Sequence, residues 1–474
     1  MSRPQLPHNP RMSSLSYYLL SLGCAKNTVD SESMAQLLSQ EGYSGVAEAS
    51  QADVLIVNTC GFIGPAREES LDVLRDLAEN KRPGQKLIAA GCLSQFWGER
   101  LAGEVAGLDG IIGTRRWMDI IEFIAQLRGD NRRQPLYHLP DQALTVGRDE
   151  KGTLRAAIQG ASAYLKVADG CRRPCAFCSI PLIKGKAVSR SPERILSEVR
   201  TLSDAGIREL IVIAQDTTDY GHDLGITDGL AWLLEQIVEA APDIDWVRLM
   251  YAYPGYVTPR LIETMVRHDQ ILSYLDIPLQ HAHPDTLRRM RRPANVDWVR
   301  RTVGTLRRSL PEIAIRTTFI VGYPGETEEE FETLLRFVEE MRFDRVGTFT
   351  YSFEPETLSS QLPGAVPEAV KAERLDRLMA AQQKISLQRN QALVGETLDV
   401  LVEGRGDGLS VGRTYRDAPE IDGLVLIDGD LPLSEIVPVR ITGALEYDLT
   451  GVVDVGEQQF VGLASRDEIS GSAS

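Results

Sequence analysis

Three of the six cysteines in this 474-residue chain stand within eight positions of one another. Cys171, Cys175 and Cys178 form a C-x3-C-x2-C pattern inside the stretch DGCRRPCAFCSIPLIKGKAVSR, residues 169–190. A structural zinc site usually takes four protein ligands, so three thiolates suit zinc poorly. They suit a 4Fe-4S cluster in which cysteines hold three irons and the fourth iron stays open to another ligand.

The other three cysteines, Cys24, Cys60 and Cys92, are spaced 36 and 32 residues apart, and each follows an apolar run: YYLLSLG, DVLIVNT and KLIAAG. A helical pattern follows the first run, from about Val29 to Gln40. Short apolar runs that alternate with helices indicate a parallel sheet buried on both faces. Ligands bind beyond the carboxyl ends of such strands, so the three thiols are expected to meet there. A single buried thiol usually only packs as a small apolar group, but three in register favour a second metal site.

A second series of apolar runs extends from about Ala161 to Thr357, and helical patterns such as SPERILSEVRTLSDAG and EEEFETLLRFVEEM separate them. The strand candidates are AYLKVADG, ELIVIAQD, WVRLMYAYP, YLDIPLQH, IRTTFIVGYPG and RVGTFTYSF. Six such units predict a partial or full (β/α) barrel whose function lies in the loops after the strands. The C-x3-C-x2-C stretch falls in the first of these loops.

The remaining segments differ in pattern. Residues 128–160 read as a linker with a short hairpin, because they combine charges, glycines and prolines without a long apolar period. A helical stretch covers roughly 367–393, and residues 395–474 hold short β-like runs typical of a small all-β barrel or sandwich. The fold class is therefore α/β, with an N-terminal parallel sheet domain, a central (β/α) partial barrel and a C-terminal small all-β barrel. The predicted boundaries are a tail at 1–15, the first domain at 16–127, the linker at 128–160, the barrel core at 161–390, the last domain at 391–462 and a tail at 463–474.

The composition is that of an ordinary globular protein, with 43% hydrophobic and 25% charged residues. No apolar run approaches the roughly 18 residues that a membrane-spanning helix needs. The N-terminal residues MSRPQLPHNPRMSS lack a hydrophobic signal core, which predicts a cytoplasmic protein. Six cysteines in such a chain favour metal binding or catalysis over disulfides.

The net charge of −16 argues against broad nonspecific binding to nucleic acid. From Gly395 onward the chain holds sixteen acidic and five basic residues, so this last sixth carries −11 of the total. A barrel that grips tRNA phosphates would need the opposite sign. Acidic residues also keep a domain soluble, but this balance favours a basic partner.

The C-x3-C-x2-C loop after the first barrel strand resembles that of radical S-adenosylmethionine enzymes. From about residue 16 to residue 462 the chain resembles the methylthiotransferases, which combine an N-terminal domain of this kind, a radical barrel and a C-terminal TRAM barrel. The motifs that carry the resemblance are SLGCAKNTVDSE (21–32), NTCGFI (58–63), AGCLSQ (90–95) and CAFCSIPLIKGKAVSR (175–190). Within the family, SLGCAKNTVDSE and the CSIP stretch are similar to the RimO branch. The tRNA-modifying MiaB branch more often reads GCQMN and CIVPYTRG.

The resemblance implies two 4Fe-4S clusters, one on Cys24, Cys60 and Cys92 and one on Cys171, Cys175 and Cys178. It implies no catalytic side chain beyond these ligands. The open iron of the second cluster would chelate S-adenosylmethionine, whose reductive cleavage releases an adenosyl radical. The first cluster would deliver sulfur, and a second S-adenosylmethionine would supply the methyl group.

The implied substrate is the β-carbon of an aspartate in the small-subunit ribosomal protein S-twelve, either free or in the subunit. Its C–H bond is too weak an acid for an ordinary side-chain base, so a radical from a cofactor is needed. Further expectations are an electron donor such as a flavodoxin or ferredoxin, no membrane, and a monomeric enzyme. The alternatives are a MiaB-like tRNA adenosine methylthiotransferase and, in another class, a noncatalytic iron–sulfur protein.

Other residues have weaker signals. Gly322, Pro324, Gly325 and Glu326 end the fifth barrel strand, and similar segments lie near the cofactor in the family. A turn that opens a helix explains the segment equally well, with Thr327 as the cap. Gln215 and Asp216, with Thr217 and Thr218, close the second strand and could reach the adenosyl ribose. His281 and His283 fit a polar loop at the barrel mouth better than a metal site, and Arg288, Arg289, Arg291 and Arg292 fit a solvated helix face better than a surface that docks ribosomal RNA.

Overall fold

The computed structural model describes residues 15–129, 134–140 and 151–454. The chain divides into two compact units, residues 1–382 and 383–474. Both predicted tails, apart from Leu15, lie outside the described residues. Within the described ranges, no helix is long and apolar enough to cross a membrane.

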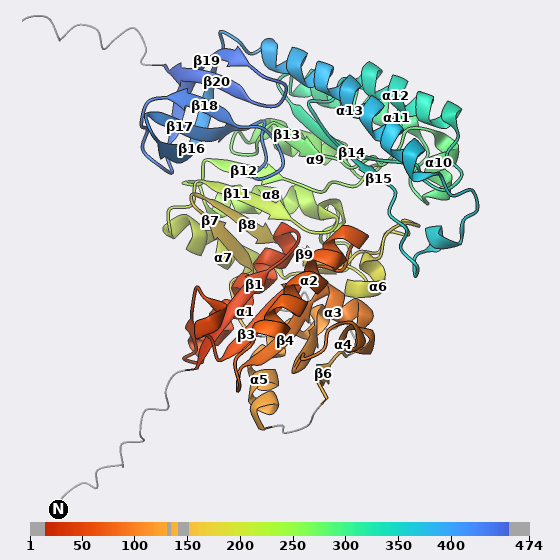
Figure 1. The fold of residues 1–474 in the computed structure, drawn as a ribbon. Coiled ribbons are helices and arrows are strands. Elements are labelled where there is room, and N and C mark those ends of the chain that lie inside the picture. The colour runs from red at the N-terminus through yellow and green to blue at the C-terminus, as the bar shows by residue number, and fades with distance from the viewer. Residues whose placement is uncertain (1–14, 130–133, 141–150, 455–474) are drawn as a thin grey trace, which may run out of the picture. The chain divides into compact units, whose positions relative to one another are not determined.

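The first unit opens with a six-stranded parallel sheet in the order β2-β1-β3-β4-β5-β6 (Figure 1). Its strands are β1 (Ser16–Ser21), β2 (Ser44–Gly45), β3 (Val54–Thr59), β4 (Lys86–Gly91), β5 (Gly110–Gly113) and β6 (Leu136–His138). The three apolar runs that precede cysteines form the adjacent strands β1, β3 and β4, as predicted. The strand order reverses between β1 and β3, the position at which sheets of this type bind ligands.

Alternate side chains of the sheet face two separate cores. Val54 and Ile56 of β3 pack on one side with helices α1 (Ala25–Gln40) and α5 (Ile120–Gly129). Leu55 and Val57 pack on the other side with α2 (Gly64–Asn80), α3 (Cys92–Trp97) and α4 (Glu99–Glu104). Because both faces are covered, β3 is buried at every position, which explains its continuous apolar run.

The barrel that follows consists of two sheets. The first has the order β12-β11-β8-β7 and the second the order β13-β14-β15, with a bridge between Val247 and Ile271 where they approach. All six predicted barrel strands are present and confirm the partial barrel. They are β8 (Ser162–Lys166), β11 (Glu209–Ile213), β12 (Trp246–Leu249), β13 (Tyr274–Asp276), β14 (Ala314–Val321) and β15 (Arg345–Thr350).

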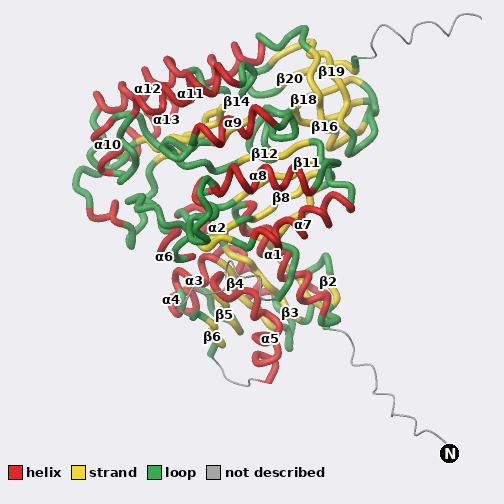
Figure 2. The backbone as a smooth tube through the Cα atoms, turned by 180° about the vertical axis from the view of Figure 1, so that it is seen from behind, coloured by secondary structure: helices red, strands yellow, loops and turns green. Residues whose placement is uncertain are grey.

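Helices alternate with these strands, and Figure 2 shows α7, α8 and α9 in front of β8, β11 and β12. Their bounds are α6 (Ile180–Lys184), α7 (Pro192–Asp204), α8 (Gly229–Ala240), α9 (Pro259–Arg267), α10 (Pro284–Arg289), α11 (Val296–Ser309) and α12 (Glu328–Met341). Thr327 caps α12 in a capping box with Glu330, which confirms the predicted helix start. The long helix α13 (Glu368–Gln391) contains the boundary between the two units.

The described part of segment 128–160 contains regular structure. Residues Leu136–His138 form β6, the edge strand of the first sheet. Strand β7 (Ala156–Gln159) turns back on β8 as an antiparallel hairpin. The described parts of this segment on either side of residues 141–150 therefore each add a strand to a neighbouring sheet.

The second unit contains a closed barrel of five short strands in the order β16-β17-β18-β20-β19. The strands are β16 (Thr397–Gly406), β17 (Leu409–Thr414), β18 (Val425–Asp428), β19 (Ile436–Ala444) and β20 (Leu449–Val453). Val400, Val425 and Val439 are fully buried in its core. This confirms the predicted small all-β barrel.

Candidate metal centres

The first cysteine group lies at the carboxyl ends of three adjacent strands. Cys24 caps helix α1 after β1, Cys60 directly follows β3, and Cys92 is the first residue of α3 after β4. Cys24 is exposed, whereas Cys60 and Cys92 are buried. The topology thus brings together three thiols that are far apart in the sequence, as the spacing predicts.

Close backbone packing holds the loops of Cys24 and Cys60 together. Gly23 has a φ of +90°, and a Cβ at this position would stand 2.8 Å from the sulfur of Cys60. Asn27 donates its side-chain amide to the carbonyl of Asn58 at 2.9 Å, and Asn58 donates back to the carbonyl of Asn27 at 3.0 Å. These reciprocal bonds tie the first turn of α1 to the end of β3.

Burial opposes the ionisation of two thiols in this first group, those of Cys60 and Cys92. Desolvation raises the pKa of Cys60, and it raises the pKa of Cys92 to about 12. The thiols of Cys24 and Cys60 add to the shift at Cys92, and Lys184 of the barrel opposes it. Thiolates in such a place need a bound cation, which lowers the pKa of the sulfur that it binds.

The second group lies in the loop between β9 (Ala168–Asp169) and α6. The amide of Cys171 donates to the carbonyl of Gly185 at 3.1 Å, and the amide of Ala176 donates to the carbonyl of Met290 at 2.9 Å. Desolvation raises the pKa of Cys171 to about 11 and that of Cys178 to about 12. This loop is therefore fixed by its backbone, and two of its three thiols, Cys171 and Cys178, are poorly solvated.

The spacing of the sulfur atoms favours a cluster over a single ion in both groups. Three thiolates on one tetrahedral zinc would stand about 3.8 Å apart, given a Zn–S bond of about 2.3 Å. In the described part of the chain, the set of possible ligands within 4.8 Å of one another is His283, Asp285 and Glu330, and neither cysteine group is this compact. A larger iron–sulfur core fits three thiols at wider spacing.

The His283 set is a weaker metal candidate. The carboxylate of Glu330 accepts two bonds from Arg289, at 2.6 and 3.0 Å, and Asp285 is paired with Arg288. Nδ1 of His283 accepts the amide of Asp285. Because its carboxylates already have cationic partners, this group agrees with the predicted polar loop at the barrel mouth.

The sheet domain and the barrel meet through a buried group of charges. Asp30 of α1 lies 2.7 Å from Lys166 of β8, 2.7 Å from Arg155 and 3.0 Å from Lys184. Asp169 lies 2.5 Å from the same Lys166 and 3.1 Å from Lys184. In sequence, Asp30 lies six residues after Cys24, and Asp169 lies two residues before Cys171.

Further contacts join the two cysteine loops across this interface. The ammonium of Lys26, two residues after Cys24, lies 3.3 Å from the ring centre of Tyr251 at the barrel mouth. The hydroxyl of Ser179, next to Cys178, donates to the carbonyl of Phe62 at 3.3 Å. Both candidate centres therefore border one interface.

Gln215 and Asp216 lie at the end of β11 beside the second cysteine group. The amide of Gln215 donates to Asp169 at 3.0 Å, while its buried oxygen has no partner among the described residues. The carboxylate of Asp216 accepts from Arg173 at 2.6 Å and from Thr218 at 2.5 Å. The Gln215 oxygen is thus available to a ligand, whereas Asp216 is engaged by neighbours.

Gly322, Pro324, Gly325 and Glu326 form a tight loop at the end of β14. The buried carboxylate of Glu326 accepts the amide of Gly322 at 3.1 Å and pairs with Arg374 at 2.8 Å. The side-chain nitrogen Nε2 of His281 is buried 3.5 Å from the same carboxylate. Glu326 therefore holds its own loop in shape.

The prediction of a solvated face for the arginine run is wrong in part. Arg288 and Arg291 are exposed, but Arg289 pairs with Glu330, and Arg292 is only 8% exposed. Helix α10 ends at Arg289, so Arg292 lies beyond it in a turn that directs the side chain inward.

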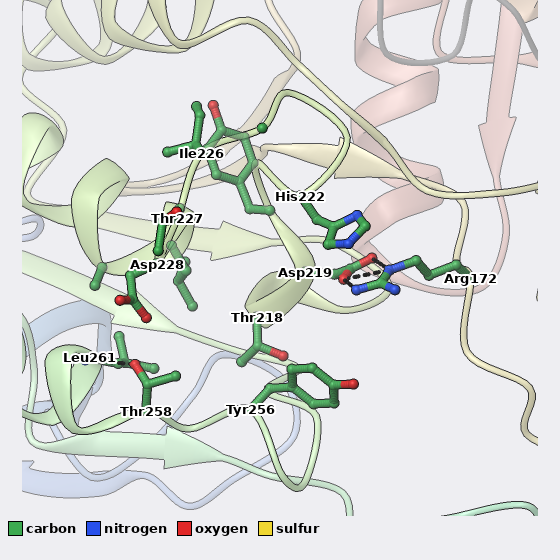
Figure 3. A pocket seen from close by; sticks show the side chains of 15 residues that line it. Arg172, Thr218, Asp219, His222, Ile226, Thr227, Asp228, Tyr256, Thr258 and Leu261 are labelled. Carbon is green, nitrogen blue, oxygen red and sulfur yellow. Dashed lines mark hydrogen bonds and ion pairs between the residues drawn. The ribbon is translucent and has the colours of Figure 1, made fainter.

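A pocket of about 380 Å³ opens beside the second cysteine loop (Figure 3). Arg172, next to Cys171, forms one wall and pairs with Asp219 at 2.6 Å. His222, Asp228 and Tyr256 also line it, from the segments that follow β11 and β12. The pocket has a mixed polar and apolar lining and adjoins the loop that carries Cys171.

The sequence patterns did not predict the buried charges around Asp30 or the buried position of Arg292, although the sequence contains some indication of the former. Asp30 lies within SLGCAKNTVDSE, four residues before the core residue Met34 and therefore on the buried face of its helix. Lys184 lies within the CAFCSIPLIKGKAVSR stretch. A charge on an apolar helix face would have indicated a buried pair, but not the identity of the partner.

Comparisons with known proteins match all three parts of the chain. A model of the radical SAM superfamily matches residues 165–338, a model of the uncharacterized protein family UPF0004 matches residues 16–113, and a TRAM domain model matches residues 394–453. The fold is similar to that of TsrM, a radical S-adenosylmethionine methyltransferase from Kitasatospora setae, with a TM-score of 0.53 and 13% identity. That match covers 84% of this chain and 77% of the other, and at this identity it concerns the fold alone.

Two full-length relatives are much more similar in sequence. The ribosomal protein uS12 methylthiotransferase RimO of Chloroflexus aurantiacus is 49% identical over 452 residues, which cover 92% of this chain and 99% of that protein. The protein of the same name from Roseiflexus sp. is 47% identical over 461 residues, which cover 92% and 97%.

Proposed function

The chain belongs to the RimO family of ribosomal protein uS12 methylthiotransferases, and from this membership we infer that it methylthiolates uS12 by radical S-adenosylmethionine chemistry. The observation that carries this function is the pair of cysteine groups at strand ends in one compact unit. Membership in the radical SAM superfamily implies a 4Fe-4S cluster and S-adenosylmethionine. When bound, these supply a radical able to remove hydrogen from an unactivated carbon.

We propose that Cys171, Cys175 and Cys178 hold this cluster and leave one iron open for S-adenosylmethionine. The loop is pinned by backbone bonds from Cys171 and Ala176, so its thiols keep their positions when the ligand changes. The loops after β11 and β14 form the walls of the cofactor site. The unpartnered oxygen of Gln215 accepts a hydrogen bond from the cofactor, while Asp216 and Glu326 act indirectly by holding their loops.

We propose that Cys24, Cys60 and Cys92 hold a second 4Fe-4S cluster, which carries the sulfur for transfer. Two observations support this proposal: the thiols gather at the switch point of the parallel sheet, and among the described residues they do not form a set whose sulfur atoms all lie within 4.8 Å of one another. The buried charges of Asp30 and Lys166 join this group to the barrel, so transfer between the two centres takes place across a fixed interface. The acceptor we propose is the β-carbon of an aspartate in uS12.

The partners follow from charge. The acidic second unit suits a basic protein and disfavours tRNA, because phosphate binding requires lysine and arginine. A MiaB-like activity on tRNA is therefore the second candidate. Its product would be methylthiolated adenosine in tRNA instead of methylthiolated aspartate in uS12. The third candidate, a noncatalytic iron–sulfur protein, does not explain why one iron of the cluster would lack a protein ligand. We further propose a monomeric, cytoplasmic enzyme that receives electrons from a flavodoxin or ferredoxin.

The test is peptide mapping of uS12 from cells with and without this enzyme, together with nucleoside analysis of their tRNA. We expect one aspartate peptide to gain the mass of a methylthio group only when the enzyme is present. Methylthiolated adenosine that depends on this enzyme would instead support the tRNA activity.

A further inference from the structure

Arg292 places a buried positive charge beside the second cysteine group. It follows α10, and its amide donates to the carbonyl of Leu287 at 2.8 Å. The preceding residue, Arg291, is exposed and has a φ of +53°. This left-handed turn sends two adjacent arginines in different directions, one to solvent and one to the barrel interior.

The guanidinium of Arg292 makes three contacts inside the barrel. One terminal nitrogen donates to the sulfur of Cys175 at 3.6 Å, and the other donates to the carbonyl of Pro278. The group also lies over the ring of Tyr253, 4.1 Å from its centre. The hydroxyl of Tyr253 is itself 3.9 Å from the sulfur of Cys175.

No carboxylate of the described residues forms an ion pair with Arg292. Arg173, which packs on the same Tyr253 ring, offers the contrast, because it pairs with Asp216 at 2.6 Å and lies 3.4 Å from Asp219. A buried charge without a counter-ion is costly, so Arg292 requires a negative group nearby. Its guanidinium faces the sulfur of Cys175, so the negative charge of a cluster held there would supply that group.

We propose that Arg292 sets the reduction potential of the cluster held by Cys171, Cys175 and Cys178, acting through the sulfur of Cys175. The inference rests on the proposed function, since it requires a cluster at these residues. Reduction adds one negative charge to the cluster, and hydrogen bonds to its sulfur ligands and nearby charge set the potential. A fixed guanidinium stabilises the reduced state and makes the potential less negative. Arg292 is thus a positioning residue for electron entry.

Tyr253 keeps this guanidinium in place. The guanidinium carbon of Arg292 lies 4.1 Å from the centre of the Tyr253 ring, and that of Arg173 lies 4.5 Å from the same centre. Cation–π contacts hold planar guanidinium groups well when they are shielded from water. Lysine could retain the charge of Arg292 but could not reach Cys175 and Pro278 with one planar group.

The test is an anaerobic redox titration of the reconstituted full-length protein, followed by electron paramagnetic resonance. The barrel cluster is identified as the signal that changes when S-adenosylmethionine is added. The variants are Arg292→Met, Arg292→Lys and, as a control of equal charge change at the adjacent exposed position, Arg291→Met. We expect a more negative reduction potential for Arg292→Met. At the wild-type midpoint potential, the ratio of reduced to oxidised cluster should be at least tenfold lower in this variant, which corresponds to a shift of about 59 mV for a one-electron couple. Arg292→Lys should fall between this variant and the wild type.

A wild-type potential in Arg292→Met overturns the inference, and so does an equal shift in Arg291→Met. If Arg292→Met fails to assemble the barrel cluster, Arg292→Lys decides: a negative shift supports the inference and an unchanged potential overturns it. A wild-type protein without any signal that responds to S-adenosylmethionine would overturn the proposed function itself, and this inference with it.

Discussion

The carboxylate of Asp30 lies 2.7 Å from the ammonium of Lys166, although 136 residues separate them and neither side chain is more than 1% exposed. Asp30 belongs to the helix that Cys24 begins, and Lys166 belongs to the strand that leads to Cys171. This pair therefore fixes the sheet domain against the barrel at the point where both candidate centres lie.

Replacing Asp30 with Asn should strongly destabilise the first unit. Lys166, Lys184 and Arg155 would remain buried with Asp169 as their nearest acid, and breaking a buried ion pair costs about 3–5 kcal/mol. The measurement is thermal unfolding of metal-free protein, with Asp72→Asn as control, since Asp72 is exposed and should change stability by less than about 0.5 kcal/mol. Equal melting temperatures for the two variants would contradict the structural role.

The effect of Asp30→Asn should also depend on pH. Although desolvation opposes it, attraction by Lys166, Lys184 and Arg155 lowers the pKa of Asp30 in the folded state. A lowered carboxyl pKa contributes stability above the unfolded value of about 3.9, and this stability is lost as the pH falls through the folded value. The difference between wild type and variant should thus be constant from pH 5 to 7 and shrink below about pH 4.

The sequence predicts the cysteine groups well because local rules decide their positions. Short continuous apolar runs form β1, β3 and β4, and parallel connectivity brings their carboxyl ends together. The position of Arg292 is different. It stands in RRMRRP beside Arg291, and its inward direction follows from the positive φ of Arg291 and from the contact with the Tyr253 ring. Partners distant in sequence decide such positions, so no local pattern reveals them.

Replacing Gly23 with Ala should disrupt the first centre alone. The new Cβ would lie 2.7 Å from the Cβ of Cys60, which real contacts do not tolerate. Gly42 is the matched control: its φ of +83° is also left-handed, but nothing lies within 4 Å of an added Cβ. With four irons in each of two clusters, the wild type should hold about eight irons. Gly23→Ala should lose about four of them, and Gly42→Ala should lose none. Full iron content in Gly23→Ala would show that the loop can move aside.

The two cysteine groups should fail in different ways. Replacing Cys171, Cys175 and Cys178 with Ala should leave about four irons, by the same stoichiometry, and abolish cleavage of S-adenosylmethionine. Replacing Cys24, Cys60 and Cys92 should also leave about four irons but preserve reductive cleavage, because the barrel cluster remains. That second variant should form no methylthiolated uS12; if it does, sulfur comes from elsewhere.

Alkylation of metal-free protein should follow thiol desolvation. With the pKa of Cys92 and of Cys178 raised to about 12, only about one in ten thousand of these thiols is ionised at pH 8. Because the thiolate is the nucleophile, labelling by iodoacetamide should be slow at pH 8 and increase about tenfold per pH unit until the fold is lost. Site-resolved mass spectrometry measures this. Rapid labelling of Cys92 at pH 8 would mean that its surroundings are open in solution.

The acidic barrel of the second unit should contribute to the binding of uS12. Its acids are not equivalent: Asp417 is 1% exposed and accepts a bond from Thr414, so reversing its charge would damage the fold. Asp428 and Asp430 are exposed and provide a cleaner test. Exchange of both for Lys should weaken binding of the basic protein and flatten its dependence on salt, since attraction between opposite charges is lost.

The matched control for this charge reversal is Glu41→Lys with Glu79→Lys, two exposed acids of the sheet domain that carry the same change in net charge. Binding to uS12 is measured by titration at two salt concentrations. If binding of uS12 depends only on the total charge of −16, both double variants should weaken binding equally. A loss confined to Asp428 and Asp430 would localise recognition to the second unit. The same variants are also incubated with tRNA. A more basic barrel surface should raise the affinity for phosphate, so tighter binding of tRNA together with weaker binding of uS12 would show that acidity in this unit selects protein over RNA.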